Sequence, residues 1–233
     1  MIYAIGDIHG QYDILIRLYD KIIEDIKFKQ DDENKIIFLG DYIDRGKQNR
    51  KVLDFLVSRQ NSREIEHVFL WGNHEQIFIE AMLNPLNQNA VGMWVGNGGL
   101  NFMHETGNVE FDYFHQTFPW GPYIRWFAKN LQTYHETGDY IFVHGGLDIR
   151  QPDMNKQDLN YVTWARHTQT DWYKTYHKWV IHGHTPNDNA VIDKNRINVD
   201  TSGWRQANNG WKLSAVALHN HLVDGDPVII SAQ

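Results

Sequence analysis

The chain has 233 residues, 42% of them hydrophobic and 22% charged, which suits one large globular domain with a real core. Its formal charge of −7 argues against a broad surface that grips nucleic-acid phosphates, and the lack of cysteine excludes disulfides, thiolate nucleophiles and iron–sulfur clusters. No run reaches the roughly 18 apolar residues of a membrane span, and no signal peptide is visible, so we expect a cytoplasmic protein with no membrane partner.

The first third of the chain alternates apolar runs with amphipathic stretches. Three β-branched apolar runs predict buried strands: 2–5, 35–39 and 66–71. Three stretches with apolar residues at helical spacing predict helices: 11–29, 48–59 and 75–83. This β-α-β-α-β order predicts a sheet with crossover helices, in which ligands collect at the carboxyl ends of the strands.

The segment 84–137 is different, because it is aromatic and rich in turn residues, with one helix expected at 123–131. We interpret it as a cap-like insertion over the site, within a single domain that spans 1–233. Further strands are expected later: 140–143, 178–181, 190–192, 196–200, 212–218 and 227–230. The whole pattern predicts an α/β fold with two sheets packed face to face and helices outside.

Five polar clusters each directly follow a predicted strand. They are GDIHG at 6–10, GDYIDRG at 40–46, GNHE at 72–75, HGG at 144–146 and HGHT at 182–185. Carboxylate and amide oxygens mixed with imidazole nitrogens are what a pair of divalent first-row metal ions needs. The clusters therefore predict a metal centre where the strands end.

The first three clusters supply oxygen ligands and one imidazole. Asp7 and His9 are two residues apart, so in extended backbone they point to one side and reach one cation; the alternative is a turn and helix-capping role. Asp41 has two carboxylate oxygens that can bridge two metals about 3.5–4 Å apart. Asn73 offers a neutral oxygen, and an ordinary turn residue is the alternative.

The last two clusters supply further imidazoles. His144 and His184 each end a strand within glycine-rich sequence, which separates them from most of the 13 histidines. His182 competes with His184, because residues two apart on an extended strand face the same way. Their spacing in the sequence does not decide between His182 and His184 as the metal ligand.

Three residues of these clusters suit catalysis rather than metal binding. His74 is a candidate general acid that protonates the leaving oxygen. Asp44 is placed to hold it by a carboxylate–imidazole hydrogen bond, and Arg45 offers a planar fork for phosphate oxygens. Arg166 is a second candidate for binding phosphate, and a surface arginine is the alternative.

With its clusters in this order, the sequence resembles the calcineurin-like metallophosphoesterase superfamily. Within it, the sequence is similar to the phosphoprotein phosphatase family, especially its small bacterial and bacteriophage serine/threonine phosphatases. The matching motifs GDIHG, GDYIDRG, GNHE, HGG and GHT extend the resemblance from about residue 1 to about residue 200. The resemblance implies a metallophosphoesterase-like α/β/β/α sandwich of two mixed sheets with outer helices.

The resemblance also implies a role for each matching residue. One metal would be held by Asp7, His9 and the bridging Asp41, and the other by Asp41, Asn73, His144 and His184. The catalytic residues would be His74 as general acid, Asp44 as its partner, and Arg45 and Arg166 on the phosphate. The match to GHT favours His184 over His182. The two ions are expected to be manganese, with iron, zinc or nickel as alternatives.

The implied reaction is hydrolysis of phosphoserine and phosphothreonine in proteins by direct attack of a metal-bridging hydroxide. The expected partner is a phosphorylated protein or a small phosphoester. The main alternative is a diadenosine tetraphosphate hydrolase, but such enzymes typically lack the aspartate that stands here as Asp44. A nucleotide or RNA-end phosphodiesterase and a non-catalytic binding module are further alternatives. The complete ligand set argues against the binding module.

Overall fold

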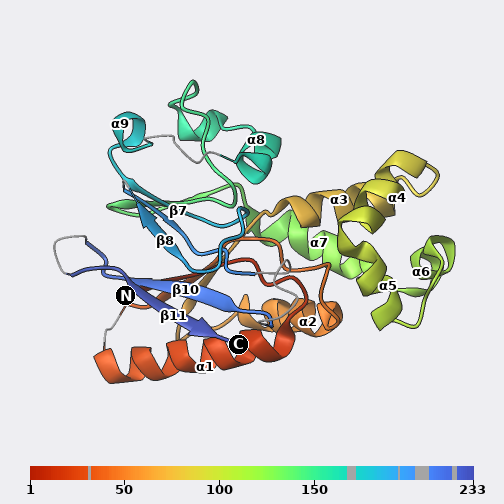
Figure 1. Ribbon diagram of the computed structural model, residues 1–233, viewed down its shortest axis with the longest axis horizontal. Helices are drawn as coiled ribbons and strands as arrows, with labels where there is room; N and C mark the ends of the chain where they lie inside the picture. Colours follow the sequence, from red (N-terminus) through yellow and green to blue (C-terminus); the bar gives the residue numbers. More distant parts are fainter. Residues whose placement is uncertain (31–32, 167–171, 194, 203–209, 222–224) are drawn as a thin grey trace.

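Two β-sheets lie face to face with helices outside them (Figure 1). The computed structural model describes residues 1–30, 33–166, 172–193, 195–202, 210–221 and 225–233. The first sheet has the order β11 (Val228–Ala232), β10 (Leu213–Leu218), β1 (Ile2–Ile5), β2 (Lys35–Phe38), β3 (Glu66–Leu70) and β4 (Leu131–Gln132). Strands β1 to β4 run parallel, while β10 and β11 are antiparallel to their neighbours.

The second sheet has parallel strands at its centre and antiparallel strands at its edges. Its order is β5 (His135–Glu136), β6 (Tyr140–Phe142), β7 (Trp179–His182), β9 (Arg196–Asn198) and β8 (Val191–Asp193). Pairs β6–β7 and β7–β9 are parallel, and β5 and β8 pair antiparallel. The predicted strands are thus present, and the two sheets are both mixed.

Alternation along the strands explains the layers. Tyr3 and Ile5 of β1 pack with the helices, while Ile2 and Ala4 pack against the second sheet. A strand buried on both faces must be apolar at every position, which is why these runs are continuous in the sequence. The structure therefore confirms the α/β/β/α sandwich.

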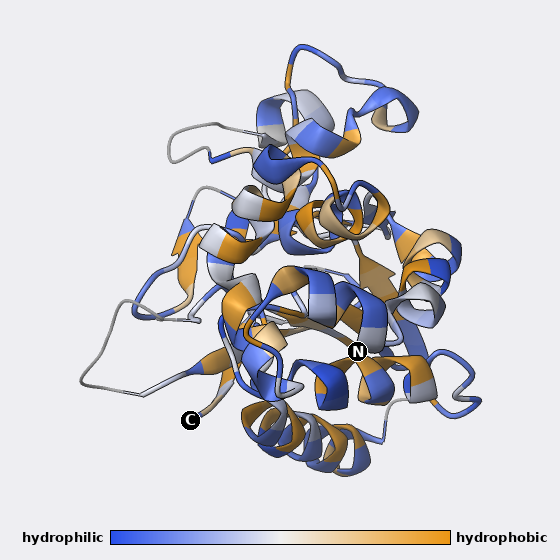
Figure 2. Ribbon diagram, turned by 90° about the vertical axis from the view of Figure 1, so that its right-hand side faces the viewer, coloured by the Kyte–Doolittle hydropathy of each residue, from blue (hydrophilic) through white to orange (hydrophobic). Residues whose placement is uncertain are grey.

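The helices cover the outer faces of both sheets. The first sheet packs against α1 (Tyr12–Lys29), α2 (Asn49–Arg59), α3 (Asn73–Leu83) and α7 (Trp120–Asn130). The second packs against α8 (Leu159–Trp164) and α9 (Tyr173–Tyr176), and a 3₁₀ turn lies at Met154–Lys156. Figure 2 shows the long α1, at the bottom, with hydrophobic and hydrophilic sides. No helix within the described ranges is long and apolar enough to cross a bilayer.

The insertion 84–137 is more helical than the sequence predicted. Besides α7 it contains α4 (Gln88–Trp94), a π-helical turn (Val95–Gly99), α5 (Leu100–Glu105) and α6 (Phe111–Thr117). Helices this short are unstable alone and form because tertiary packing stabilises them. Their shared contact is an aromatic cluster with α3: Phe78, Trp94, Phe102, Phe114 and Phe118.

We expect Phe102→Ala to destabilise the whole chain, because Phe102 is fully buried with its ring centroid 5.0 Å from that of Phe118. A buried Phe→Ala change costs about 3–5 kcal/mol. Denaturant unfolding should give one transition at lower denaturant concentration, as for a single domain. Leu86→Ala, at a side chain 96% exposed, is the control and should change stability by less than about 0.5 kcal/mol. Two transitions, only one of them shifted, would contradict the single domain.

Candidate metal centre

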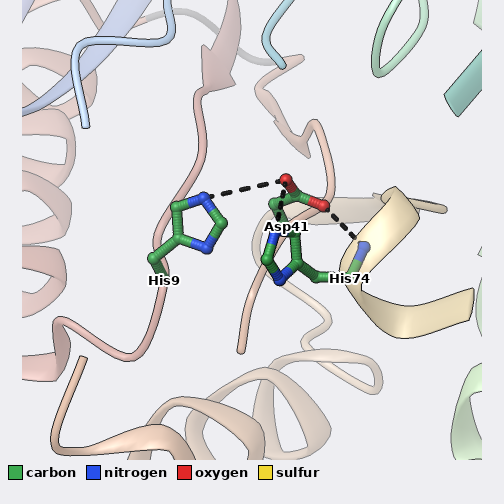
Figure 3. A group of neighbouring side chains, drawn as sticks. All are labelled: His9, Asp41 and His74. Atoms are coloured by element: carbon green, nitrogen blue, oxygen red, sulfur yellow. Dashed lines mark hydrogen bonds and ion pairs between the residues drawn. The ribbon is translucent and has the colours of Figure 1, made fainter. Parts of the chain in front are cut away.

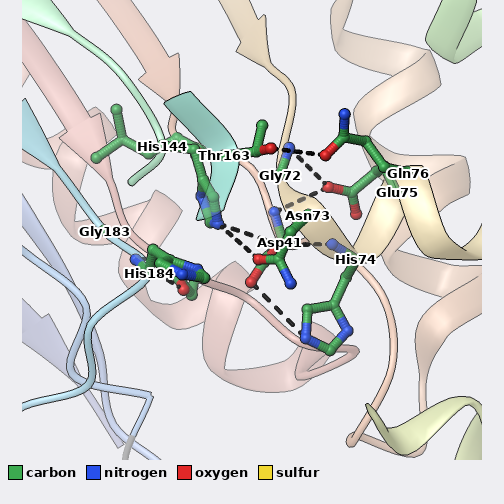
Figure 4. A network of polar contacts seen from close by, with 12 residues as sticks. Asp41, Gly72, Asn73, His74, Glu75, Gln76, His144, Thr163, Gly183 and His184 are labelled. Atoms are coloured by element: carbon green, nitrogen blue, oxygen red, sulfur yellow. Dashed lines mark hydrogen bonds and ion pairs between the residues drawn. The ribbon is translucent and has the colours of Figure 1, made fainter. Parts of the chain in front are cut away.

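Five strands bring their carboxyl ends to one edge of the sandwich. Asp7 and His9 follow β1, Asp41 follows β2, Asn73 and His74 begin α3 after β3, His144 follows β6, and His184 follows β7. Figure 4 shows the side chains that follow β2, β3, β6 and β7 pointing toward one another. All of these residues are at most 4% exposed. The fold therefore gathers polar groups from both sheets in a buried place.

Left-handed backbone is concentrated at this edge. Of the eight non-glycine residues with positive φ in the described ranges, five belong to it: His9, Asp41, Asp44, Arg45 and His184. Each costs roughly 1–2 kcal/mol relative to ordinary backbone, so the surroundings must hold it in place. Such strain is typical of functional sites.

Glu75 holds the backbone at Asp41. Its Oε2 accepts hydrogen bonds from the N–H groups of Asp41 (2.9 Å) and Gly72 (3.1 Å), and its Oε1 accepts from Tyr42 (2.8 Å). Burial, with the nearby Asp41 carboxylate, raises the pKa of Glu75 to about 7. Glu75 therefore ties the loop after β2 to the start of α3.

The Asp41 carboxylate lies at the centre of the site (Figure 3). Its Oδ2 is 3.7 Å from His9 Nε2 and 3.9 Å from His74 Nε2, and its Oδ1 is 3.3 Å from His144 Nε2. Burial favours a higher pKa for Asp41, but the imidazoles of His144 and His74 lower it well below its usual value. Asp41 is thus an anion that faces histidines from three elements.

Within the described residues, two groups of side chains have ligand atoms mutually within 4.8 Å. One is His9, Asp41 and His74, and the other is Asp41, His144 and His184. Asp41 belongs to both, as a bridging carboxylate requires. Asn73 joins the second group, because its Oδ1 lies 3.2 Å from His144 Nε2.

The hydrogen bonds of the imidazoles suit metal binding. His144 Nδ1 donates to the Leu39 carbonyl (2.7 Å) and His9 Nδ1 donates to the Ile43 carbonyl (3.0 Å), which leaves each Nε2 facing Asp41. Nε2 of His74 and of His184 is buried and has no hydrogen-bond partner in the part of the chain that the structure describes. Hard oxygens and imidazole nitrogens gathered in this way fit divalent first-row cations.

A proton on His144 accounts for its contacts with two oxygens. Burial alone would lower the pKa of His144, but the Asp41 and Asp7 carboxylates raise it to about 10. Its Nε2–H then faces Asp41 Oδ1 and Asn73 Oδ1. The same nitrogen and oxygens would hold a cation in place of this proton.

Asp7 lies outside both groups and contacts the loop after β7. Its Oδ1 and Oδ2 accept from the backbone N–H of His184 at 3.2 and 3.1 Å. A Cβ at Gly183 would lie 2.1 Å from Asp7 Oδ1, so a larger residue here would displace the Asp7 carboxylate. Burial, followed by the neighbouring Asp200, raises the pKa of Asp7 well above its usual value.

His74 and Asp44 form a buried pair. His74 Nδ1 lies 2.7 Å from Asp44 Oδ2, and the indole Nε1 of Trp94 donates to Asp44 Oδ1 at 2.8 Å. His74 and Asp44 are both fully buried, and this burial raises the pKa of Asp44. The pair fixes the ring so that its Nε2 faces Asp41.

The two candidate arginines differ in placement. Arg45 is half-buried and its Nη1 donates to His9 Nε2 at 2.7 Å. Arg166 is exposed, and its charge contributes to lowering the pKa of His184, which burial and His144 bring to about 3. The structure thus brings Arg45 to the centre and leaves Arg166 at its rim.

The structure places His182 and His184 in different surroundings. His184 belongs to the second group, whereas His182 packs edge-on against Trp172 with ring centroids 5.4 Å apart. His184 has left-handed backbone (φ 64°), so the strand ends before it and the two side chains do not share a face. The rule that residues two apart on an extended strand face the same way therefore does not apply to His182 and His184.

Several residues that hold the site had no role in the sequence prediction. Glu75 was recognisable as half of a capping box, since a glutamate three residues after the N-cap of a helix commonly reaches back to it. Trp94 acts on Asp44 through a contact between residues 50 apart in the sequence, whereas Asn49 contacts Asp44 from only 5 residues away. Asp200 is fully buried; its Oδ1 accepts from Ser202, and its Oδ2 has no hydrogen-bond partner among the described residues.

The chain belongs to the calcineurin-like phosphoesterase family, whose model matches residues 1–230. Bis(5'-nucleosyl)-tetraphosphatase PrpE [asymmetrical] of Halalkalibacterium halodurans is 26% identical over 84% of this chain and 83% of its own. Shewanella-like protein phosphatase 1 of Plasmodium berghei is 29% identical over 70% of this chain, but this match covers only 43% of that protein. A solved structure described provisionally as a diadenosine tetraphosphatase has a TM-score of 0.62, 16% identity, and coverage of 100% of this chain and 93% of that one.

The family match makes this protein a metallophosphoesterase, which hydrolyses phosphoesters with the help of divalent metal ions. The structural match at 16% identity shows the shared fold alone. The sequence relatives include proteins named for two different substrates, so they support phosphoester hydrolysis as the common activity.

We expect Glu75→Gln to loosen the loop that carries Asp41. The Glu75 carboxylate has two acceptor oxygens, which accept from three backbone N–H groups, whereas the amide of glutamine has only one acceptor oxygen. A buried donor left unsatisfied costs about 1–3 kcal/mol. Manganese affinity, measured by calorimetry, should fall by roughly tenfold or more. Glu80→Gln, on the exposed side of the same helix, is the matched control. Unchanged affinity and stability in Glu75→Gln would show that the loop does not depend on Glu75.

Proposed function

We propose that this protein is a dinuclear-metal-dependent phosphomonoesterase that hydrolyses phosphoserine and phosphothreonine in proteins. The observation that carries the proposal is the buried His74–Asp44 pair, 2.7 Å apart, next to the central Asp41. Among the substrates that the family match allows, this pair suits an ester with a poor leaving group.

The leaving group decides whether an acid is needed. Serine and threonine leave as alkoxides, which are strongly basic and must be protonated as the phosphorus–oxygen bond breaks. A nucleotide leaves from a tetraphosphate as a weakly basic phosphate, which needs no such proton. The Asp44 carboxylate orients the His74 ring for delivery of a proton from Nε2 to the leaving oxygen. A departing alkoxide needs this proton, whereas a departing nucleotide does not.

Two divalent cations, with manganese the expected ion, are proposed to bind the residues gathered around Asp41. We assign Asp7, His9 and Asp41 to one ion, and Asp41, Asn73, His144 and His184 to the other. When bound, such cations supply charge stabilisation for phosphate oxygens and lower the pKa of water, so that no covalent phosphoenzyme is needed.

The remaining residues bind and orient the phosphate. The planar guanidinium of Arg45 offers two parallel N–H donors to phosphate oxygens beside the centre, and the exposed Arg166 does so from the rim. The first turn of α3, which begins at Asn73, directs its N-terminal dipole to the same place. Positioning and electrostatic stabilisation are the main contributions that a protein makes to phosphoryl transfer.

The second candidate function is hydrolysis of bis-nucleosyl tetraphosphates. The match with the PrpE protein favours it, because that relative aligns over 83% of its own length, whereas the protein phosphatase from Plasmodium aligns over 43%. This candidate uses the same proposed metal ligands and differs in the leaving group.

A comparison of two substrates tests the proposed function. The manganese-loaded protein is given a phosphoserine/phosphothreonine peptide and diadenosine tetraphosphate, and kcat/KM is measured for each. We expect the peptide to be preferred. Preference for the dinucleotide would overturn the proposal in favour of the second candidate.

We expect His74→Asn to lower kcat on the phosphopeptide by roughly 10²–10⁴, the usual contribution of a general acid. On p-nitrophenyl phosphate the loss should be much smaller, because nitrophenolate leaves without a proton. Bound manganese, measured by elemental analysis, should be unchanged, since no metal is assigned to His74. Equal losses on both substrates would contradict the acid role.

A further inference from the structure

We propose that Glu105, at the end of α5 in the insertion, is a positioning residue for the general acid pair His74 and Asp44. The inference rests on the proposed function in one respect, namely that His74 donates a proton to the leaving group. Within the described residues, Glu105 makes no hydrogen bond to His74 or Asp44; it acts through Asn49.

Asp44 is held at two places. Its carboxylate is fixed by His74 and by the Trp94 indole, which comes from the insertion. Its backbone has left-handed geometry (φ 72°), and its N–H donates to Asn49 Oδ1 at 2.6 Å. Since left-handed backbone is costly for aspartate, the second contact matters for where the carboxylate points.

The Asn49 side chain is fully buried, and both its amide oxygen and its amide nitrogen have hydrogen-bond partners. Its Oδ1 accepts from Asp44, and its Nδ2 donates to the Gly46 carbonyl (2.9 Å) and to Glu105 Oε2 (2.9 Å). An amide can turn by half a rotation and exchange its oxygen for its nitrogen, unless its partners forbid it. Glu105 accepts hydrogen bonds only, so it keeps Nδ2 on its own side and Oδ1 on the side of Asp44.

Glu105 also fixes the backbone from which Asn49 projects. Its Oε2 accepts from the Asn49 N–H at 2.6 Å and its Oε1 from the Arg50 N–H at 3.0 Å, the first N–H groups of α2. A carboxylate there satisfies helix donors that have no partner within the helix and interacts favourably with the helix dipole. One side chain of the insertion thus sets both the position and the orientation of Asn49.

The same insertion holds Arg45, the next residue after Asp44. The Arg45 N–H donates to the Gly98 carbonyl (3.1 Å), and Asn101 Nδ2 donates to the Arg45 carbonyl (2.5 Å). The insertion therefore contacts the loop of Asp44 and Arg45 at several points along its backbone. Displacement of α5 should move the acid pair relative to the centre.

The test compares Glu105→Gln with Glu110→Gln, an exposed glutamate of the same segment whose loss changes the net charge equally. Glu105→Gln places an NH₂ group opposite N–H donors, so Asn49 should lose its fixed orientation. We expect kcat on the phosphopeptide to fall by roughly tenfold, as for other residues that orient a catalytic group. KM and kcat on p-nitrophenyl phosphate should change by less than about threefold, because nitrophenolate needs no acid. Glu110→Gln should match the unchanged protein.

Proton NMR of the metal-free protein gives a second readout that does not depend on turnover. The His74 Nδ1 proton, held by Asp44 at 2.7 Å, should resonate far downfield, and Glu105→Gln should shift or broaden it while Glu110→Gln does not. Equal losses on both substrates with an unmoved His74 proton would overturn the proposal and leave Glu105 as a helix cap. If Glu105→Gln does not fold, Glu105→Asp, whose shorter carboxylate keeps the charge, takes its place with the same criteria. If the unchanged protein hydrolyses no phosphopeptide, the proposed function fails, and the NMR shift still decides on the positioning role.

Discussion

Five carboxyl groups are buried within one edge of the sandwich, and the rest of the site follows from what this burial requires. Asp7, Asp41, Asp44, Glu75 and Asp200 are each at most 2% exposed. Carboxylates brought this close repel one another, and burial removes the water that would otherwise stabilise them. Backbone N–H groups, imidazoles and an indole replace that water here. The negative charge of the buried carboxylates favours the binding of multivalent cations at this site.

Close approach of the loops sets the backbone geometry around these carboxyls. A Cβ at Gly72 would lie 2.2 Å from the Asp41 nitrogen, so only glycine lets the loops after β2 and β3 touch. The left-handed residues that follow the strands then turn side chains from both sheets inward. The ends of strands from two sheets converge at this edge. Both the glycines of the motifs and the strained residues beside them follow from this convergence.

Local pattern was sufficient to predict the layers and the gathering of the motif residues, since strands buried on both faces are continuously apolar and their ends lie together. Helices α4 to α6 were missed because their stability comes from aromatic packing against α3. Glu75, Asn49 and Glu105 were given no role because their partners lie elsewhere in the chain, 56 residues apart for Asn49 and Glu105. Spacing within a motif carries no information about such contacts.

The hydrogen bond from Arg45 to His9 links two binding events. Nδ1 of His9 donates to the Ile43 carbonyl, so the ring has a single lone pair, on Nε2, and Arg45 uses it. A cation and the guanidinium exclude each other at this nitrogen. An anion that draws Arg45 away therefore makes His9 available, and a cation on His9 frees Arg45 for the anion. Because linkage is reciprocal, the cation proposed at His9 and the phosphate proposed at Arg45 would each raise the affinity of the other by the same factor.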